Sequence, residues 1–469
     1  MNGTPTTDSR PTPVRLDVDL DLVRKYNVPG PRYTSYPPAT HFTDAIAVGQ
    51  LWERICANNQ TPRDLSLYFH LPFCQSLCWY CGCTTVITTD QRVSGTYLGY
   101  LKRELAILGR FLNPKSRVVQ IHFGGGTPTF LTPEEIRSLG EMIHSRFRLA
   151  ADLEAGVEVD PRRLIRGHLE ALREIGCNRV SLGVQDNNPL VQKAVHRIQP
   201  YAQTKTAVDW IRAAGFKSLN VDLIYGLPRQ TPESFEQTLT ETLVLQPDRL
   251  AVFSYAHVPW IKPAQKILAD QTLPSPETKM QLLKLTIERL TSEGYVYIGM
   301  DHFARATDEL AEAQRTKTLQ RNFQGYSTRG GADLYGFGLS SISQADGVYW
   351  QNFKELPDYY AALDARTAPL AKAYLLTDED KIRRATIMRL MCDLGLDYQA
   401  MSRMLGIEFA RHFAGELDSL SDFEEDGLIQ KCASGFTVTG TGRLFIRNIA
   451  MRFDAYAATR TENRFSKTI

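Results

Sequence analysis

The sequence lacks the long apolar runs and the strong net charge that would place it in a membrane or on nucleic acid. No stretch of its 469 residues approaches the roughly 20 apolar residues of a membrane-spanning helix. Its 54 basic and 52 acidic residues leave a formal charge of only +2. Residues 1–14 have no apolar core of a signal peptide. We therefore expect a cytoplasmic globular protein with no membrane span and no nucleic-acid partner.

Cysteine is also scarce, because eight residues in a chain of this length do not make a disulfide scaffold. Four of the eight are scattered and are expected to be small buried apolar residues. They are Cys56, Cys177, Cys392 and Cys432. The other four lie within ten residues of one another and need a chemical explanation.

Strand-like and helix-like patterns alternate from residue 65 onward. Strands are predicted at 65–70, 118–123, 156–160, 179–185, 219–225, 250–255 and 295–300. Helices are predicted at 96–112, 133–147, 164–175, 203–214, 232–244 and from 276. This alternation indicates βαβ units, a parallel sheet and a full or partial (β/α) barrel, whose functional residues lie at the carboxyl ends of the strands. Those ends carry His70, Gly124–Gly126, Glu158, Gln185, Asp222 and Ala256.

Three regions are predicted along the chain. Residues 1–50 form an N-terminal arm, of which 1–20 are expected to be mobile. Residues 51–365 form the α/β catalytic domain. Residues 366–469 form a small helical domain of winged-helix type, because a capping box at Thr377 opens helical runs that a short hairpin follows. This small domain shows no basic recognition stripe.

The cysteine cluster has the spacing C-x3-C-x2-C at Cys74, Cys78 and Cys81, with Cys83 two residues further on. Three thiolates can hold one corner of an iron–sulfur cube and leave one iron open to a ligand, whereas a closed electron-transfer cluster uses four cysteines. The open iron is what chelation of S-adenosylmethionine requires. Two alternatives stay open at this point, a closed cluster with Cys83 as fourth ligand and a zinc site, although the second C-x2-C pair of a zinc site is absent.

A glycine-rich loop, Gly124-Gly125-Gly126-Thr127-Pro128, follows a predicted strand. Glycines allow backbone groups to approach a ligand closely, and the loop lacks the lysine of a phosphate-binding P-loop. Glu158 at a strand end is a candidate partner for the positive end of a ligand; its alternative is a structural ion pair.

These motifs together resemble the radical-SAM superfamily, and within it the oxygen-independent coproporphyrinogen III oxidase family. The resemblance extends over nearly the whole chain. It implies one [4Fe–4S] cluster on Cys74, Cys78 and Cys81, with Cys83 not a ligand, and two S-adenosylmethionine molecules. It places Tyr68, Gly125, Glu158 and Ile342 at the first of these molecules. It places Tyr80, Gly126, Thr127, Gln185, Arg197, Asp222 and Ala256 at the second. Position 80 is commonly Phe in the family and is Tyr here.

The family's reaction is the oxidative decarboxylation of two propionate side chains of coproporphyrinogen III to vinyl groups. Its products are protoporphyrinogen IX, CO2, methionine and 5′-deoxyadenosine, in anaerobic haem biosynthesis. The resemblance implies functional roles for Tyr68, His70 and Glu158 and an external reductant such as flavodoxin or ferredoxin. We also expect a monomer, because a barrel of this size with a covering domain can work alone. The alternatives are a haem chaperone and another radical-SAM protein acting on a tetrapyrrole. Arg32 and Arg305 are candidate clamps for the substrate carboxylates.

Overall fold

The structure is a computed structural model that describes residues 13–16, 20–46, 48–268, 273–345, 347–457 and 465–468. Most of residues 1–20, which the sequence predicts to be mobile, lie outside the described residues.

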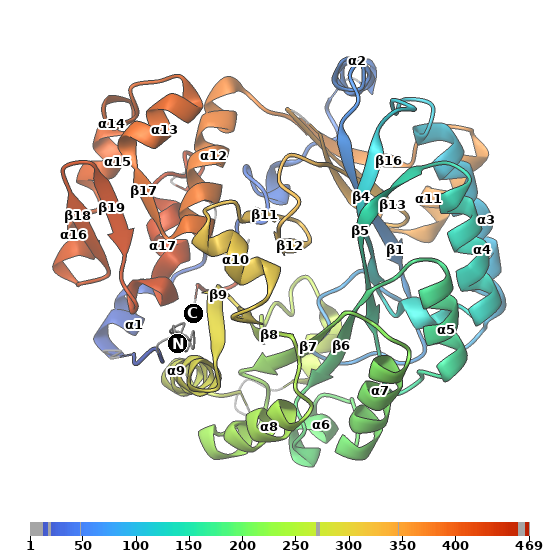
Figure 1. Ribbon diagram of the computed structural model, residues 1–469, viewed down its shortest axis with the longest axis horizontal. Coiled ribbons are helices and arrows are strands. Elements are labelled where there is room, and N and C mark those ends of the chain that lie inside the picture. The colour runs from blue at the N-terminus through green and yellow to red at the C-terminus, as the bar shows by residue number, and fades with distance from the viewer. Residues whose placement is uncertain are drawn as a thin grey trace, which may run out of the picture.

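A twelve-stranded sheet curves through the centre of the molecule (Figure 1). Its strand order is β16-β15-β14-β13-β1-β4-β5-β6-β7-β8-β10-β9. Seven neighbouring strands run parallel to one another. They are β13 (Asp333–Phe337), β1 (Asp64–Leu71), β4 (Arg117–Gly125), β5 (Arg148–Val159), β6 (Arg179–Gln185), β7 (Ser218–Tyr225) and β8 (Arg249–Ser254). The predicted α/β fold with a mostly parallel sheet is confirmed.

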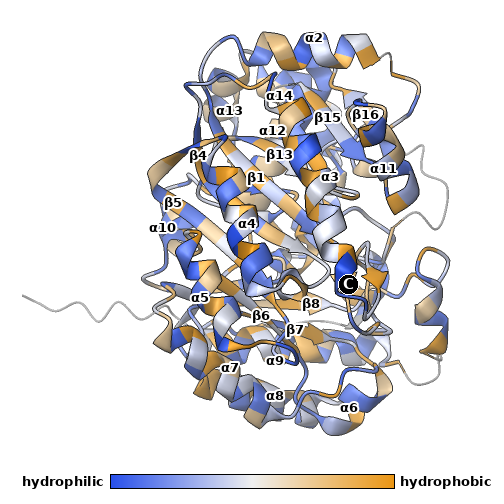
Figure 2. Cartoon of the chain, turned by 90° about the vertical axis from the view of Figure 1, so that its right-hand side faces the viewer, coloured by the Kyte–Doolittle hydropathy of each residue, from blue (hydrophilic) through white to orange (hydrophobic). Residues whose placement is uncertain are grey.

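Helices cover the outer face of the parallel strands. They are α3 (Arg92–Leu108), α4 (Pro133–His144), α5 (Arg166–Glu174), α6 (Pro189–Ala194), α7 (Tyr201–Ala213), α8 (Pro232–Val244) and α9 (Pro276–Ser292). On α3, Leu101, Leu105 and Leu108 face the sheet because they recur at helical spacing. In Figure 2 the outer surfaces of the helices are mixed in hydropathy, while the strands beneath them are mostly apolar. This packing fixes the strand ends that carry the site.

The edge of the sheet beyond β8 differs from the sequence prediction. Residues 295–300 form a strand, β9 (Tyr295–Gly299), but β10 (His302–Arg305) lies between β9 and β8 and runs antiparallel to both. The reason is a tight turn in which Gly299 and Met300 both have positive φ, so the chain folds back as a hairpin. On the opposite edge the antiparallel strands β14 (Ile342–Ala345), β15 (Val348–Asn352) and β16 (Leu370–Leu375) extend the sheet past residue 365.

The C-terminal region is a helical unit with a small sheet. Its helices are α12 (Asp378–Asp393), α13 (Tyr398–Leu405), α14 (Phe409–His412), α15 (Ala414–Asp418), α16 (Ser421–Glu425) and α17 (Ile446–Met451). Its three strands, in the order β17 (Gly395–Asp397), β19 (Gly435–Val438) and β18 (Ile429–Cys432), form an antiparallel sheet. Thr377 caps α12 through a reciprocal pair of hydrogen bonds with Asp380.

The segment before the barrel is packed against the rest of the chain. It contains α1 (Leu20–Tyr26) and α2 (Val48–Asn58), and between them Tyr33 and Tyr36 are fully buried. Pro29 pairs with Lys467 in an antiparallel bridge. The remaining short elements are β2 (Phe73–Cys74), β3 (Val86–Ile87), α10 (Glu309–Arg315), β11 (Gln320–Asn322), β12 (Gly325–Ser327) and α11 (Leu356–Asp364). None of the described helices is both long enough and apolar enough to cross a membrane.

Candidate active site

The cysteine loop leaves the carboxyl end of β1 and is held in place by backbone hydrogen bonds. The amide of Thr127 donates to the carbonyl of Phe73 at 2.9 Å, and the amide of Thr88 donates to that of Cys74 at 3.0 Å. Within the loop the amide of Cys81 donates to the carbonyl of Cys78 at 3.0 Å. The loop is therefore a fixed element built onto β1 and β4.

Cys74, Cys78 and Cys81 line a cavity of about 490 Å³ inside the barrel, which we call the active-site cavity. All eight cysteines are free thiols. Within the described residues, no three His, Cys, Asp or Glu side chains converge on a point where one metal ion could bind. An iron–sulfur cube binds each of three thiolates through a different iron. Three cysteines on the wall of one cavity are the donor set that such a group uses.

Two guanidinium groups lie beside the sulfur of Cys78. Arg162 Nη2 is 3.5 Å and Arg197 Nη1 is 3.6 Å from Cys78 Sγ. Both arginines also bind Asp160, at 2.6 and 3.1 Å. Burial alone would raise the pKa of Asp160, but the neighbouring Arg197 and Arg162 charges lower it to about 2. The two guanidinium groups thus place positive charge beside a sulfur that, as a ligand of iron, would carry negative charge.

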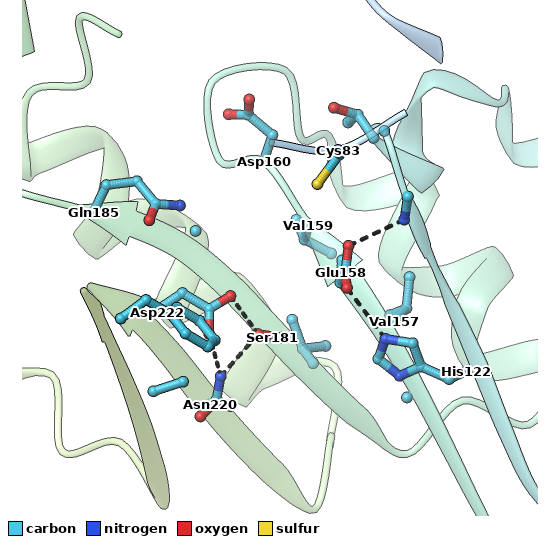
Figure 3. A pocket seen from close by; sticks show the side chains of 18 of the residues that line it. Cys83, His122, Val157, Glu158, Val159, Asp160, Ser181, Gln185, Asn220 and Asp222 are labelled. Atoms are coloured by element: carbon cyan, nitrogen blue, oxygen red, sulfur yellow. Dashed lines mark hydrogen bonds and ion pairs between the residues drawn. The ribbon is translucent and has the colours of Figure 1, made fainter. Parts of the chain in front are cut away.

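Glu158 ends β5 and faces the active-site cavity (Figure 3). One carboxylate oxygen is 3.3 Å from His122 Nε2, and the other accepts the amide of Gly125 at 3.2 Å. Burial acts to raise the pKa of Glu158, but these two donors outweigh it and the pKa lies below its usual range. The carboxylate is therefore a negative group at the cavity wall, suited to a cationic ligand.

Residues 124–126 are glycines because neighbouring protein groups occupy the space that a side chain would fill. A Cβ at Gly124 would lie 2.8 Å from Glu158 Oε1, and one at Gly126 would lie 2.5 Å from the Pro72 backbone. Gly125 has φ +109°, and a Cβ there would lie 2.6 Å from the His70 ring. The glycine-rich motif alone predicts close approach of a ligand here. In the structure, Glu158, His70 and the cysteine loop occupy that space.

Tyr68 and His70 on β1 form a fixed pair behind the glycine loop. His70 Nε2 is 2.9 Å from the carbonyl of Thr84, so it must carry the proton and donate. His70 Nδ1, 3.1 Å from Tyr68 Oη, then accepts from the hydroxyl. Burial lowers the pKa of His70, which keeps the ring neutral. The pair connects β1 to the residue after Cys83.

A second polar group lies across the cavity on β6 and β7 (Figure 3). The Ser181 hydroxyl donates to Asp222 at 2.8 Å, and Asn220 Nδ2 donates to the same carboxylate at 2.7 Å. Burial raises the pKa of Asp222 to about 6. Gln185 stands at the end of β6 with φ +70°, a strained value for a residue with a side chain. The two walls offer separate polar anchors, one at Glu158 and one at Asp222.

Comparison with known proteins finds relatives that match nearly the full length of the chain. The chain is 45% identical over 454 residues to the oxygen-independent coproporphyrinogen III oxidase of Pseudomonas aeruginosa, covering 96% of this chain and 98% of the relative. It is 44% identical over 456 residues to the Escherichia coli enzyme of that name, covering 97% and 99%. The chain belongs to the oxygen-independent coproporphyrinogen III oxidase family.

The other comparisons agree with membership of this family. The Radical SAM superfamily profile matches residues 68–241, and the HemN C-terminal domain profile matches residues 376–445. A solved structure titled "Coproporphyrinogen III oxidase (HemN) from Escherichia coli is a Radical SAM enzyme" superposes with a TM-score of 0.89 at 43% identity, covering 94% of this chain and all of that one.

Most of the site residues expected from the family resemblance line the active-site cavity together. They are Tyr80, Gly125, Gly126, Thr127, Glu158, Gln185, Arg197 and Asp222, with the three cysteines. Tyr68 and His70 lie behind this wall. The Tyr68 ring stacks on the His122 ring, with 6.0 Å between the ring centroids. Ala256 lines a different cavity, and Ile342 packs beside Phe42 and Tyr349 on β14.

Sequence reasoning missed Asp160, Arg162 and His122. The signal for the first two is a pair of opposite charges directly after a predicted strand, because Asp160 follows the last residue of β5 and Arg162 lies in the turn after it. His122 lies two residues before Gly124 on β4, and its sequence pattern indicates only a strand residue. Of the two candidate clamps, Arg32 pairs with Asp301, and Arg305 donates to the Pro247 carbonyl at 3.2 Å.

Proposed function

We propose that the chain is an oxygen-independent coproporphyrinogen III oxidase. It converts two propionate side chains of coproporphyrinogen III to vinyl groups and yields protoporphyrinogen IX and CO2, with methionine and 5′-deoxyadenosine as the other products. The observation that carries the proposal is the set of three cysteines on one cavity wall beside Arg162 and Arg197. Full-length identity of 44–45% to relatives of that name supports it.

In this proposal Cys74, Cys78 and Cys81 hold the [4Fe–4S] cluster and leave one iron open. When bound, the cluster supplies the electron that cleaves S-adenosylmethionine to a carbon radical, which takes hydrogen from a propionate. Cys83 is not a ligand. The proposal includes an external reductant such as flavodoxin or ferredoxin, a monomeric chain and a cytoplasmic location.

The chain's own residues bind and orient the two S-adenosylmethionine molecules. Glu158 accepts hydrogen bonds from the ammonium of the first, and Gly125 and Ile342 lie along it. Tyr80, Gly126, Thr127, Gln185, Arg197, Asp222 and Ala256 surround the second. Tyr68 and His70 fix the cysteine loop relative to the glycine-rich loop. His70 does this by bonding to the Thr84 carbonyl and by filling the space beside Gly125.

The test is an anaerobic assay of the reconstituted protein with reductant, S-adenosylmethionine and coproporphyrinogen III. Cys78→Ala is expected to lose iron, sulfide and both products, 5′-deoxyadenosine and protoporphyrinogen IX. Cys432→Ala is the matched control, because Cys432 is exposed on β18. Formation of 5′-deoxyadenosine without the tetrapyrrole product would keep the radical chemistry and reject the substrate. Haem binding without either product would favour a chaperone.

A further inference from the structure

A second pocket, of about 340 Å³, lies between the cysteine loop and exposed residues that follow β5 and α6, and we call it the loop pocket. Its lining includes Cys74, Gln75 and Ser76 of the cysteine loop, and the exposed residues Arg163, His196 and Ile198. Five residues line both the loop pocket and the active-site cavity, namely Cys74, Ser76, Thr127, Asp160 and Arg162. A group held by Cys74 is therefore separated from the loop pocket by a single layer of residues.

His196 fixes the exposed wall of the loop pocket to the cysteine loop. Its Nδ1 is 2.9 Å from the Leu77 carbonyl, and because a carbonyl only accepts, Nδ1 donates. The His196 ring stacks on the ring of Trp79, with 5.1 Å between the centroids, and Trp79 directly follows Cys78. His196 has φ +55°, an uncommon backbone value that surrounding contacts must hold in place. A stacked aromatic pair thus leads from the exposed surface to the residue beside Cys78.

The lining of the loop pocket is positively charged. It contains Arg162, Arg163 and one acid, Asp160, which already binds Arg162 and Arg197. Lys193 lies three residues before His196, near the end of α6. Arg163 and Lys193 are both exposed, and no carboxylate of the described residues pairs with either side chain. These two charges are therefore open to a partner.

The chain segments around the loop pocket repeat this charge pattern. Residues 161–169 and 187–201 contain five lysines or arginines and no aspartate or glutamate, and residues 74–89 contain no charged side chain. Ile198 in the lining is 59% exposed, and Leu190 at the start of α6 is 65% exposed. Apolar side chains next to charged ones are typical of a protein interface, and transient redox complexes use small ones.

We propose that the loop pocket and its basic surroundings are the docking site of a small acidic electron-carrier protein, which reduces the cluster. The inference rests on the proposed function, which places a cluster on the cysteine loop and requires an external reductant. One electron leaves the carrier, which is oxidised, and reduces the cluster, with no bond made or broken.

Two arguments favour this surface over the cavity side. Electron transfer falls steeply with distance, so a carrier must dock where little protein separates it from the cluster, and the cavity side is filled by S-adenosylmethionine and the substrate. Flavodoxins and ferredoxins are acidic proteins, and a basic surface of the opposite sign steers and orients them.

The first measurement is the affinity of the reconstituted enzyme for an oxidised flavodoxin, determined by calorimetry at low ionic strength. The double variant Arg163→Glu/Lys193→Glu is expected to bind at least about tenfold more weakly, because two attractive charges become repulsive. The loss is expected to shrink as added salt screens the charges.

The second measurement separates docking from chemistry by following 5′-deoxyadenosine formed from S-adenosylmethionine. With flavodoxin hydroquinone below saturation, the double variant is expected to be slower than the wild type by a factor similar to its loss of affinity. With dithionite, a small inorganic reductant that needs no docking surface, the rates are expected to be equal, because Arg163 and Lys193 lie outside the lining of the active-site cavity.

The matched control is Arg146→Glu/Lys115→Glu, which makes the same change of charge. Both residues are exposed and precede β5 and β4, at the end of the strands opposite the cysteine loop. This control is expected to keep the flavodoxin affinity within about twofold of the wild type. Arg163→Lys/Lys193→Arg preserves both charges and is expected to retain binding.

The outcomes distinguish this inference from the proposed function. Unchanged flavodoxin affinity in Arg163→Glu/Lys193→Glu would overturn the docking site, and so would an equal loss in the Arg146→Glu/Lys115→Glu control. A matching loss of rate with dithionite would also overturn it, because the substitutions would then act on the site itself. A wild type that binds flavodoxin through this surface but cleaves no S-adenosylmethionine with either reductant would instead refute the proposed function and leave the docking site standing.

Discussion

Replacing Glu104 with glutamine is expected to remove a pH-dependent share of the protein's stability. Glu104 lies on α3 and is fully buried. Its carboxyl accepts the amide of Gly338 at 2.7 Å, Asn352 Nδ2 at 2.6 Å and the Tyr359 hydroxyl at 2.7 Å. These bonds tie α3 to the turn after β13, to β15 and to α11.

The magnitude follows from the pKa. Burial raises the pKa of Glu104 from 4.5 to about 7, although the three donors act in the opposite direction. The folded state therefore keeps the proton over a range in which the unfolded chain has lost it. The resulting stabilisation is complete below pH 4.5 and is lost as pH rises through about 7, and it amounts to about 3 kcal/mol.

Glutamine does not titrate in this range, so the variant lacks the pH-dependent share. Its amide nitrogen cannot accept a hydrogen bond and meets either the Gly338 amide or Asn352 Nδ2, so we expect a pH-independent cost of about 1–3 kcal/mol. In urea unfolding, the wild type is expected to lose about 3 kcal/mol between pH 4.5 and pH 7 while the variant does not, so the difference between them changes by that amount across this window. Glu53→Gln, on the exposed face of α2, is the control. A difference between wild type and Glu104→Gln that stays constant across the window would refute the reasoning.

Two other substitutions test residues that support the site. Gly125→Ala places a Cβ 2.6 Å from the His70 ring at φ +109°, so we expect the free energy of unfolding to fall by about 2 kcal/mol and the iron content to decrease. Gly99→Ala is the control, because its Cβ would enter open space, and equal melting temperatures of the two variants would contradict the expectation. Arg447→Met removes the donor to the Pro31 and Lys467 carbonyls, so we expect about 2 kcal/mol of destabilisation. Limited proteolysis near residue 30 is expected to be faster, and an unchanged cleavage rate would contradict this role of Arg447.

The sequence predicted the barrel strands well because each is a short apolar run between helical patterns. Residues 179–185 form β6 at the predicted bounds, and residues 219–225 correspond to β7 with one residue added. The pairing of 295–300 was beyond prediction, because periodicity identifies a strand but not its neighbour. The hairpin that places β10 beside β8 depends on a turn at Gly299 and Met300, and Met at positive φ has no sequence signal.

The cysteine motif and the family resemblance predicted most of the cavity wall, because strand ends of a parallel sheet meet at one edge. They did not predict the side chains that lower the pKa values of Glu158 and Asp160. Asp160 draws Arg162 and Arg197 together from segments 35 residues apart, and His122 reaches Glu158 from the neighbouring strand. Such pairs depend on register, which a single sequence leaves open. The domain boundaries at residues 50 and 365 stay predictions.

The bridge between Pro29 and Lys467 implies an order of assembly. The amide of Thr468 donates to the carbonyl of Val28 at 2.8 Å, across 440 residues of chain. During synthesis, the barrel strands and the cysteine loop are complete long before this partner of the arm leaves the ribosome. The arm is therefore locked in its final place only after translation reaches the tail. Until then Pro29 lacks its bridge partner, and Arg447 lacks the Lys467 carbonyl that accepts its hydrogen bond.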